Sequence, residues 1–374
     1  MGLPSSAGIR NVDAVYYFVS DLERSRRLFV DQLDFSEVAA AEDEAEARVV
    51  FEADRVRFVC VSPKNEHSEA ARWLSCHPEG MGCVAFRVRD AEEAFRFIEG
   101  RGGNPVSGIQ EEEGEGGLIR WFDIMTPFGD ARWRFVERGD DALLPGLPRL
   151  AEARGGSNRF RFRVIDHITS NFRSMRPALL WMEHVMGFEQ YWDIAFHTSD
   201  MSESLERGSG LKSVVMRDPT SGVKFANNEP AYPFFDQSQI KLFIDDLRGE
   251  GIQHIALITE NIIETVSGLR DRELPFFVTP DSYYELLPER LERIGVQAID
   301  EEISTLQRLG ILVDGAAERK YMLQIFLQEM ASIHKQPSAG PFFFEIIQRK
   351  GDPGFGGGNF RALFESIERQ QEAR

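Results

Sequence analysis

The chain alternates between short apolar runs rich in β-forming residues and amphipathic segments with helical spacing. Residues 11–19 (NVDAVYYFV) predict a strand, and the apolar spacing that follows predicts a helix that begins after Ser20, its cap, and reaches Leu33. A second strand at 83–88 (CVAFRV) precedes a helix for which Asp90 is the expected cap. The N-terminal half is therefore expected to hold two units in which a strand, a helix and further strands follow one another.

The same order returns in the second half. Residues 162–169 (FRVIDHIT) predict a strand, and 173–185 predict a helix that tolerates Pro177 only in its first turn. A strand at 251–259 (GIQHIALIT) and a helix at 262–269 follow. The other expected elements are strands at 48–51, 56–62, 121–124, 131–137, 211–216, 223–227, 321–327 and 342–348, and a terminal helix at 360–371.

Residues 143–158 (LLPGLPRLAEARGGSN) have the composition of a linker between domains. We expect an N-terminal domain at 1–150 and a C-terminal domain at 159–374. The acidic stretch 110–115 (QEEEGE) is expected to be a solvated loop. Four strand–helix–strands units predict a duplicated α+β fold, with two curved, mostly antiparallel sheets and helices outside them.

Aligning the two halves isolates candidate ligands. The aligned segments are VDAV (12–15) with IDHI (165–168), CVAF (83–86) with HIAL (254–257), and RFVER (134–138) with EIIQR (345–349). At three equivalent places the second half carries metal-ligating residue types that the first half lacks. They are His167, His254 and Glu345, against Ala14, Cys83 and Arg134.

Two imidazoles and one carboxylate can occupy one face of an octahedral metal and leave three positions open, which suits Fe(II) and oxygen chemistry. Zn(II) can also bind such a set. A single histidine in a strand is more often a satisfied polar group than a ligand. Glu345, however, follows three phenylalanines, and a carboxylate buried there needs a partner. The coordinated absence of all three residues from the other repeat favours a metal site.

Composition narrows the class of partner. The 374 residues include 43 basic and 61 acidic side chains, for a net charge of −18. This balance argues against a nucleic-acid or anionic-membrane partner. No apolar run approaches the ~20 residues of a transmembrane helix. Three cysteines without metal-type spacing fit a reducing compartment, so we expect a cytoplasmic protein.

Many segments together resemble one family. The sequences IDHITSNF, LKSVVMRDP, NNEPA, GIQHIALIT, YMLQIF, FFFEIIQRKG and GFGGGNFRALFESIERQ are similar to those of 4-hydroxyphenylpyruvate dioxygenases. The likeness is dense from Ile165 onward and looser before it, mainly in DAVYYFVSDLERSRRLFVDQLDF. The resemblance implies the vicinal-oxygen-chelate fold of duplicated βαβββ modules. It further implies an N-terminal domain without metal ligands and a C-terminal helix that gates the site.

The resemblance also implies an activity. His167, His254 and Glu345 would hold a non-haem Fe(II). The enzyme would convert 4-hydroxyphenylpyruvate and O₂ to homogentisate and CO₂ by oxidative decarboxylation, ring hydroxylation and side-chain migration, a step of tyrosine catabolism. Members of the family pair through surfaces in the N-terminal domain, so a homodimer or homotetramer is expected.

Pocket residues carry over by motif position. Phe343 also shares a strand face with Glu345, two residues on. The implied polar pocket consists of Ser213, Asn228, Gln239, Gln253 and Gln324. The implied ring clamp consists of Phe326 and Phe343, and the implied hinge and gate of Phe355, Asn359 and Phe360.

Three other functions compete. 4-Hydroxymandelate synthase uses the same substrate, metal and fold, but Asn228 and the segment around Phe360 favour the dioxygenase. An extradiol ring-cleaving dioxygenase would need a further histidine near the metal, and none stands out. A metal-free binding protein of the same fold is disfavoured because the triad is complete.

Overall fold

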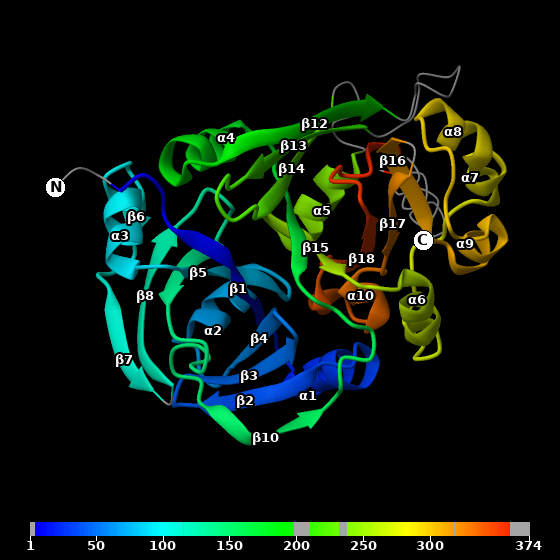
Figure 1. The fold of residues 1–374 in the computed structure, drawn as a ribbon. Coiled ribbons are helices and arrows are strands. Elements are labelled where there is room, and N and C mark those ends of the chain that lie inside the picture. The colour runs from blue at the N-terminus through cyan, green and yellow to red at the C-terminus, as the bar shows by residue number, and fades with distance from the viewer. Residues whose placement is uncertain (1–3, 115, 198–209, 232–237, 318, 360–374) are drawn as a thin grey trace.

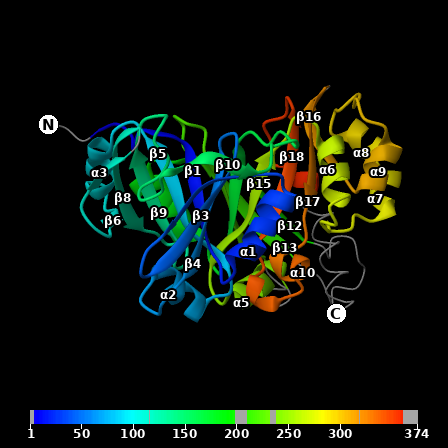
Figure 2. The ribbon, with the colours of Figure 1, turned by 90° about the horizontal axis from the view of Figure 1, so that it is seen from below.

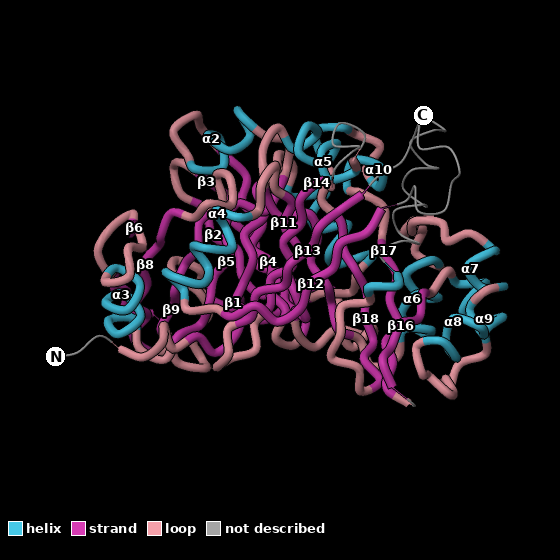
Figure 3. The backbone as a smooth tube through the Cα atoms, turned by 90° about the horizontal axis from the view of Figure 1, so that it is seen from above, coloured by secondary structure: helices cyan, strands magenta, loops and turns pink. Residues whose placement is uncertain are grey.

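The computed structural model describes residues 4–114, 116–197, 210–231, 238–317 and 319–359. Two curved sheets lie side by side, one from each half of the chain (Figure 1). Strands occupy the centre of the molecule and helices its periphery (Figure 3). The predicted terminal helix at 360–371 lies outside the described residues.

The N-terminal sheet has the strand order β10-β2-β3-β4-β1-β5-β9-β8-β6, and β7 pairs with β8. Its strands are β1 (Ile9–Phe18), β2 (Ser36–Glu42), β3 (Glu46–Ala53), β4 (Val56–Pro63), β5 (Gly80–Val88), β6 (Asn104–Pro105), β7 (Gln110–Gly114), β8 (Gly117–Met125), β9 (Arg132–Glu137) and β10 (Arg149–Gly155). The helices of this half are α1 (Leu22–Arg26), which continues as a π-helix at Arg27–Gln32, α2 (Glu69–Cys76) and α3 (Ala91–Glu99).

The C-terminal sheet has the order β12-β13-β14-β11-β15-β18-β17-β16. Its strands are β11 (Ile165–Asn171), β12 (Glu189–His197), β13 (Gly210–Arg217), β14 (Lys224–Pro230), β15 (Gly251–Ile258), β16 (Leu312–Ala317), β17 (Lys320–Phe326) and β18 (Phe343–Lys350). The helices are α4 (Arg176–Trp181), continued by a π-helix at Met182–Met186, α5 (Gln239–Leu247), α6 (Ile262–Arg270), α7 (Asp281–Glu285), α8 (Leu287–Arg293), α9 (Ile303–Leu309) and α10 (Met330–Ile333), with a 3₁₀ turn at Pro337–Ala339.

The two sheets repeat one topology. In each, the first strand of one module pairs antiparallel with the first strand of the next, and parallel with the last strand of its own module. The pairs β5–β9 and β15–β18 are parallel in the same way. All other pairings are antiparallel. The predicted duplicated α+β fold with two curved, mostly antiparallel sheets is therefore confirmed.

Three local predictions differ from the structure. Asp21, not Ser20, caps α1, because its carboxylate accepts from the backbone N–H groups of two residues in the first turn. Residues 110–114 form the edge strand β7 rather than a loop, since a hairpin with β8 satisfies their backbone while acidic side chains face water. Part of the predicted linker is strand β10, which pairs with β2.

The two halves pack on a shared aromatic core. Phe344 of β18 is fully buried, and its ring lies 5.3 Å from that of Phe58 and 6.1 Å from that of Phe29, both in the N-terminal half. Trp133 and Phe225 make a second contact across the same junction, with centroids 4.9 Å apart. Helices α6 to α9 lie at the far end of the C-terminal half (Figure 2). Strands β11, β15 and β18, which carry the three candidate ligands, thus lie at the centre of the molecule, close to the junction of the two halves.

Candidate metal centre

Strand register brings the three predicted ligands together. His167 of β11 pairs with Ala256 of β15, and Ala256 pairs in turn with Glu345 of β18. His254 lies two residues before Ala256 and therefore points to the same face of the sheet. One sheet face thus carries two imidazoles and one carboxylate from three adjacent strands.

The three side chains converge and are buried. The Nε2 atoms of His167 and His254 each lie 3.3 Å from Oε2 of Glu345. The residues are 4%, 3% and 1% exposed, respectively. One potential ligand atom from each lies within 4.8 Å of the other two. The structure therefore confirms that the predicted triad is one cluster able to hold a metal ion.

A neighbouring side chain orients each member of the triad. Nδ1 of His167 lies 2.9 Å from Oδ1 of Asp166, and Nδ1 of His254 lies 3.0 Å from Oε1 of Gln253. Gln324 donates through Nε2 to Oε1 of Glu345 at 2.7 Å. These bonds turn both Nε2 atoms and one carboxylate oxygen toward a common point, as second partners of metal ligands generally do.

Burial and mutual charge set the ionisation of the triad. Burial by itself would raise the pKa of Glu345, but the charge and hydrogen bonds of the two histidines outweigh it and lower the pKa to about 2. Burial lowers the pKa of His254 despite the nearby carboxylate. For His167, burial lowers the pKa, but Glu345 and Asp166 outweigh it and the net direction is upward. An ionised carboxylate and a neutral imidazole are the forms that bind metal.

The equivalent place in the N-terminal sheet is filled by an ion pair. Ala14, Ala85 and Arg134 are successive register partners there, matching the row that contains His167 and Glu345. Arg134 donates to both oxygens of Asp123, at 2.6 and 2.8 Å, and to the hydroxyl of Tyr16 at 3.1 Å. A guanidinium cannot bind a cation, so this half has exchanged ligands for a closed polar network.

Polar side chains form a row beside the triad. Ser213, Asn228 and Asn171 are register neighbours across β13, β14 and β11, and Asn228 donates through Nδ2 to Oδ1 of Asn171 at 3.1 Å. Four buried atoms on this face of the sheet have no hydrogen-bond partner among the described residues. They are Ser213 Oγ, Asn228 Oδ1, Asn171 Nδ2 and Thr169 Oγ1. These atoms are suited to hydrogen-bond a bound polar molecule, because a buried polar atom without a partner costs about 1–3 kcal/mol.

Sequence reasoning named Ser213 and Asn228 but missed Thr169 and Asn171. The missed residues follow His167 at spacings of two and four along β11, so period-two alternation places all three on one face. That spacing was a signal available in the sequence.

Gln239, also predicted, is the buried first residue of α5. Gln253 is the extra residue of a β-bulge in β15, which allows its side chain to reach the ring of His254.

The predicted aromatic pair borders the triad. The ring of Phe343 stacks on His254 at 5.0 Å and 24°, and Phe326 meets the same imidazole edge-on at 5.9 Å. Phe326 and Phe343 are themselves 6.2 Å apart at 82°. To hold a substrate ring between them, two parallel side-chain rings must lie about 7 Å apart, twice the van der Waals contact distance. The two side chains thus form a corner of the site, and their role as a clamp on substrate stays a prediction.

The chain beyond β18 returns to the site. Phe355 is 4% exposed, and its ring lies 5.0 Å from that of His167. Asn359 donates through Nδ2 to Oε1 of Gln324 at 2.8 Å. Its own Oδ1 accepts from Tyr283 and Arg290, both at 2.9 Å. Sequence reasoning missed these two residues of α7 and α8, and predicted Phe360 lies outside the described residues.

Comparison with known proteins agrees with this architecture. A family model described as the Glyoxalase/Bleomycin resistance protein/Dioxygenase superfamily matches residues 11–131 and 164–286. The chain is therefore a duplicated member of that superfamily.

Relatives that match over nearly their full length identify the family within this superfamily. A 4-hydroxyphenylpyruvate dioxygenase of Dictyostelium discoideum is 33% identical, over 97% of this chain and 98% of its own length. One from Danio rerio is 32% identical, over 99% of this chain and 93% of its own length. The chain belongs to the 4-hydroxyphenylpyruvate dioxygenase family. A solved structure of a 4-hydroxymandelate synthase triple mutant from Streptomyces coelicolor superposes with a TM-score of 0.81 at 25% identity, covering 97% of this chain and 99% of that one.

None of the helices in the described ranges combines the length and apolar content needed to cross a membrane.

Proposed function

We propose that this chain is an Fe(II)-dependent dioxygenase that converts 4-hydroxyphenylpyruvate and O₂ to homogentisate and CO₂. The observation that carries the proposal is the buried convergence of His167, His254 and Glu345 in a chain of this family. In the overall reaction, the C–C bond to the carboxylate breaks and CO₂ leaves. One oxygen atom of O₂ enters the new carboxylate, and the other becomes the ring hydroxyl as the side chain migrates.

The donor set supports iron at this site. Two imidazole nitrogens and one carboxylate oxygen from adjacent strands match the two-histidine, one-carboxylate set of non-haem Fe(II) oxygenases. No Cys thiolate, which would favour Zn(II), belongs to the cluster. When bound, Fe(II) supplies the redox chemistry that activates O₂.

The protein's own residues bind and orient the substrate. The row of Ser213, Asn228 and Asn171 offers donor and acceptor atoms that are free within the described ranges, Ser213 Oγ, Asn228 Oδ1 and Asn171 Nδ2, to a hydroxylated keto acid. Phe326 and Phe343 offer apolar walls for the aromatic ring. Gln324 holds Glu345 in place while Phe355 packs beside His167 and excludes water from that side.

4-Hydroxymandelate synthase activity is the second candidate. The structural neighbour of that name covers nearly the whole chain. The two reactions start from the same keto acid and differ in which carbon is hydroxylated, so small changes in ring placement decide between them. Asn228, expected in the dioxygenase, lies in the polar row and favours ring hydroxylation.

The test is anaerobic reconstitution with Fe(II), followed by 4-hydroxyphenylpyruvate and O₂, with products identified by mass spectrometry. Homogentisate with CO₂ release supports the proposal, and hydroxymandelate supports the second candidate. Failure to consume O₂ would contradict both. Glu345→Ala should lose iron and turnover. The matched surface variant Glu260→Ala, which removes only exposed ion pairs with Arg161 and Arg163, should retain both.

Two further expectations belong to this proposal. A cytoplasmic location is supported by the three free thiols of Cys60, Cys76 and Cys83, as expected in a reducing compartment. Assembly as a homodimer or homotetramer stays a prediction, and sedimentation velocity would measure it.

A further inference from the structure

The ring of His167 is held by a carboxylate that belongs to a larger charged cluster. Asp166 accepts two hydrogen bonds from Arg349, from Nε to Oδ2 and from Nη2 to Oδ1, both at 2.7 Å. Nζ of Lys224 lies 3.6 Å from the same Oδ1. Asp166 and Arg349 are largely buried, with side chains 3% and 16% exposed. The orientation of this carboxylate is therefore fixed by two cations.

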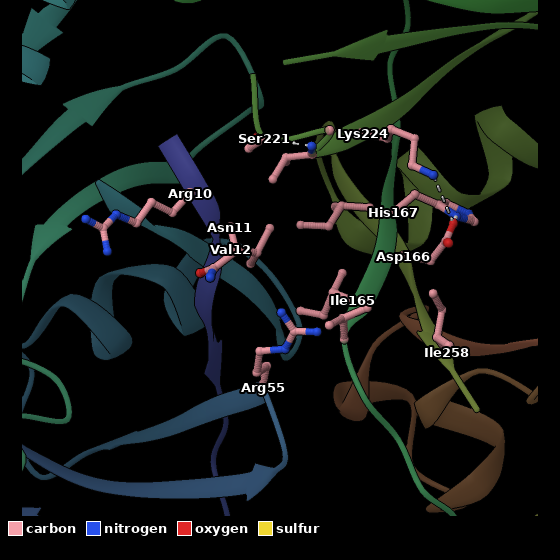
Figure 4. A pocket seen from close by; sticks show the side chains of 14 residues that line it. Arg10, Asn11, Val12, Arg55, Ile165, Asp166, His167, Ser221, Lys224 and Ile258 are labelled. Carbon is pink, nitrogen blue, oxygen red and sulfur yellow. Dashed lines mark hydrogen bonds and ion pairs between the residues drawn. The ribbon is translucent and has the colours of Figure 1, made fainter. Parts of the chain in front are cut away.

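A β-bulge places the carboxylate where it can reach the ring. β11 advances from Ile165 to His167 while β15 advances by one residue, so Asp166 is the extra residue. Without the bulge, adjacent side chains would point to opposite faces of the sheet. Figure 4 shows Asp166 beside His167, with Lys224 approaching from the other side. A cavity of about 330 Å³ between the two halves borders these three residues.

The N-terminal half repeats the cluster without the histidine. Asp13 is the extra residue of the equivalent bulge in β1 and accepts from Arg138, at 2.8 Å from Nε and 2.5 Å from Nη2. Arg57 lies 3.3 Å from Oδ1 of Asp13, as Lys224 lies near Asp166. Where the C-terminal half has His167, this half has Ala14. The ion pair therefore has a structural role common to both halves, and only one copy faces a ligand.

We infer that Asp166, clamped by Arg349, is a positioning residue that fixes the His167 ring with Nδ1 protonated and Nε2 turned toward the metal. A carboxylate only accepts hydrogen bonds, so the 2.9 Å contact requires the proton on Nδ1. Nε2, 3.3 Å from Glu345, is then left with its lone pair directed into the cluster. The anionic partner also makes Nε2 more basic and therefore a stronger ligand for a metal ion. The inference rests on the proposed function, because it assumes that His167 binds a metal.

The repeat supplies a matched control. Asp166→Asn and Asp13→Asn make the same change of charge at the same place in two copies of one cluster. Each leaves an arginine without its full carboxylate partner, so both should lower the midpoint of thermal unfolding to a similar extent. Only Asp166→Asn alters the partner of a ligand. Binding of Co(II) to the metal-free full-length protein, measured by competition with a chelator and by visible absorption, separates the two roles.

We expect Asp166→Asn to weaken Co(II) binding by about 10- to 100-fold and to change the absorption spectrum of the bound ion, with Asp13→Asn within twofold of wild type. Equal Co(II) affinities in the two variants would overturn the inference, whether both match wild type or both are weakened. If either single variant does not fold, the charge-neutral doubles Asp166→Asn/Arg349→Gln and Asp13→Asn/Arg138→Gln decide in the same way. Wild-type protein that binds neither Co(II) nor Fe(II) would refute the proposed function itself.

Discussion

Gln324 links the metal cluster to the chain beyond β18, so replacing it should affect both. Its Nε2 donates to Glu345 at 2.7 Å, and its Oε1 accepts from Asn359 at 2.8 Å. The side chain is 3% exposed. Methionine has nearly the same length and shape, but its thioether cannot donate to Glu345 and accepts only weakly from Asn359. Gln324→Met should therefore remove the bond that orients the Glu345 carboxylate and leave the amide of Asn359 without its acceptor. It should not open a large cavity.

The magnitude follows from the two bonds. A hydrogen bond to a charged group contributes about 1.5–3 kcal/mol, and each 1.4 kcal/mol is a factor of ten in affinity. If the bond to Glu345 serves to orient the ligand, Co(II) binding should weaken by about 10- to 100-fold. The unpaired buried donor of Asn359 should cost the fold a further ~1–3 kcal/mol.

The assay is Co(II) affinity by chelator competition, together with O₂ consumption on 4-hydroxyphenylpyruvate and the denaturant midpoint. Gln328→Met is the matched control, because that glutamine is only partly buried and makes one long bond, 3.4 Å, to the carbonyl of Phe276. It should match wild type in metal affinity. A Gln324→Met protein with Co(II) affinity within twofold of wild type would refute the positioning of Glu345 by this amide.

Three other variants test separate parts of the structure. Arg134→Met should destabilise the protein by about 3 kcal/mol, because it removes both hydrogen bonds from Arg134 to the buried carboxylate of Asp123 and leaves that carboxylate with Arg132, at 3.6 Å. Metal content per folded molecule should be unchanged, and loss of metal would contradict the assignment of that network to a non-ligating half. Phe343→Ile should retain iron but alter the ratio of products in mass spectrometry, and an unaltered ratio would argue against contact with the substrate ring. Native protein should show one fast-reacting thiol at pH 8, that of exposed Cys76, because burial raises the pKa of the Cys60 and Cys83 thiols, the latter to about 12. Cys76→Ser should abolish the reaction, and a fast second thiol would show that the core opens.

Much of the fold was predictable because its signals are local. Strand and helix periods depend on neighbouring residues, and they predicted the strands that carry the ligands as well as the start of α3 at Asp90. The repeat was visible because the same short patterns recur. Contrast between the repeats singles out His167, His254 and Glu345 from the sequence alone.

Other features could not be predicted because they depend on pairing across the fold. The acidic strand β7 is extended only because β8 lies beside it. Tyr283 reaches Asn359 although 76 residues separate them along the chain. The perpendicular arrangement of Phe326 and Phe343 is set by packing against His254, which no spacing in the sequence specifies.

The sequence by itself determined the duplication and the residue types of the ligands, since both are properties of order along the chain. Only the tertiary structure decided which distant side chains each copy of the ion-pair cluster brings together. Asp13 accepts from Arg138 and Asp166 from Arg349, although more than 120 residues of chain separate the partners in each pair. The bulge then turns Asp166 toward the ring of its neighbour His167, where the first half has Ala14. The physical reason is register: β-sheet pairing places residues from distant strands on one face, and function depends on which side chains meet there.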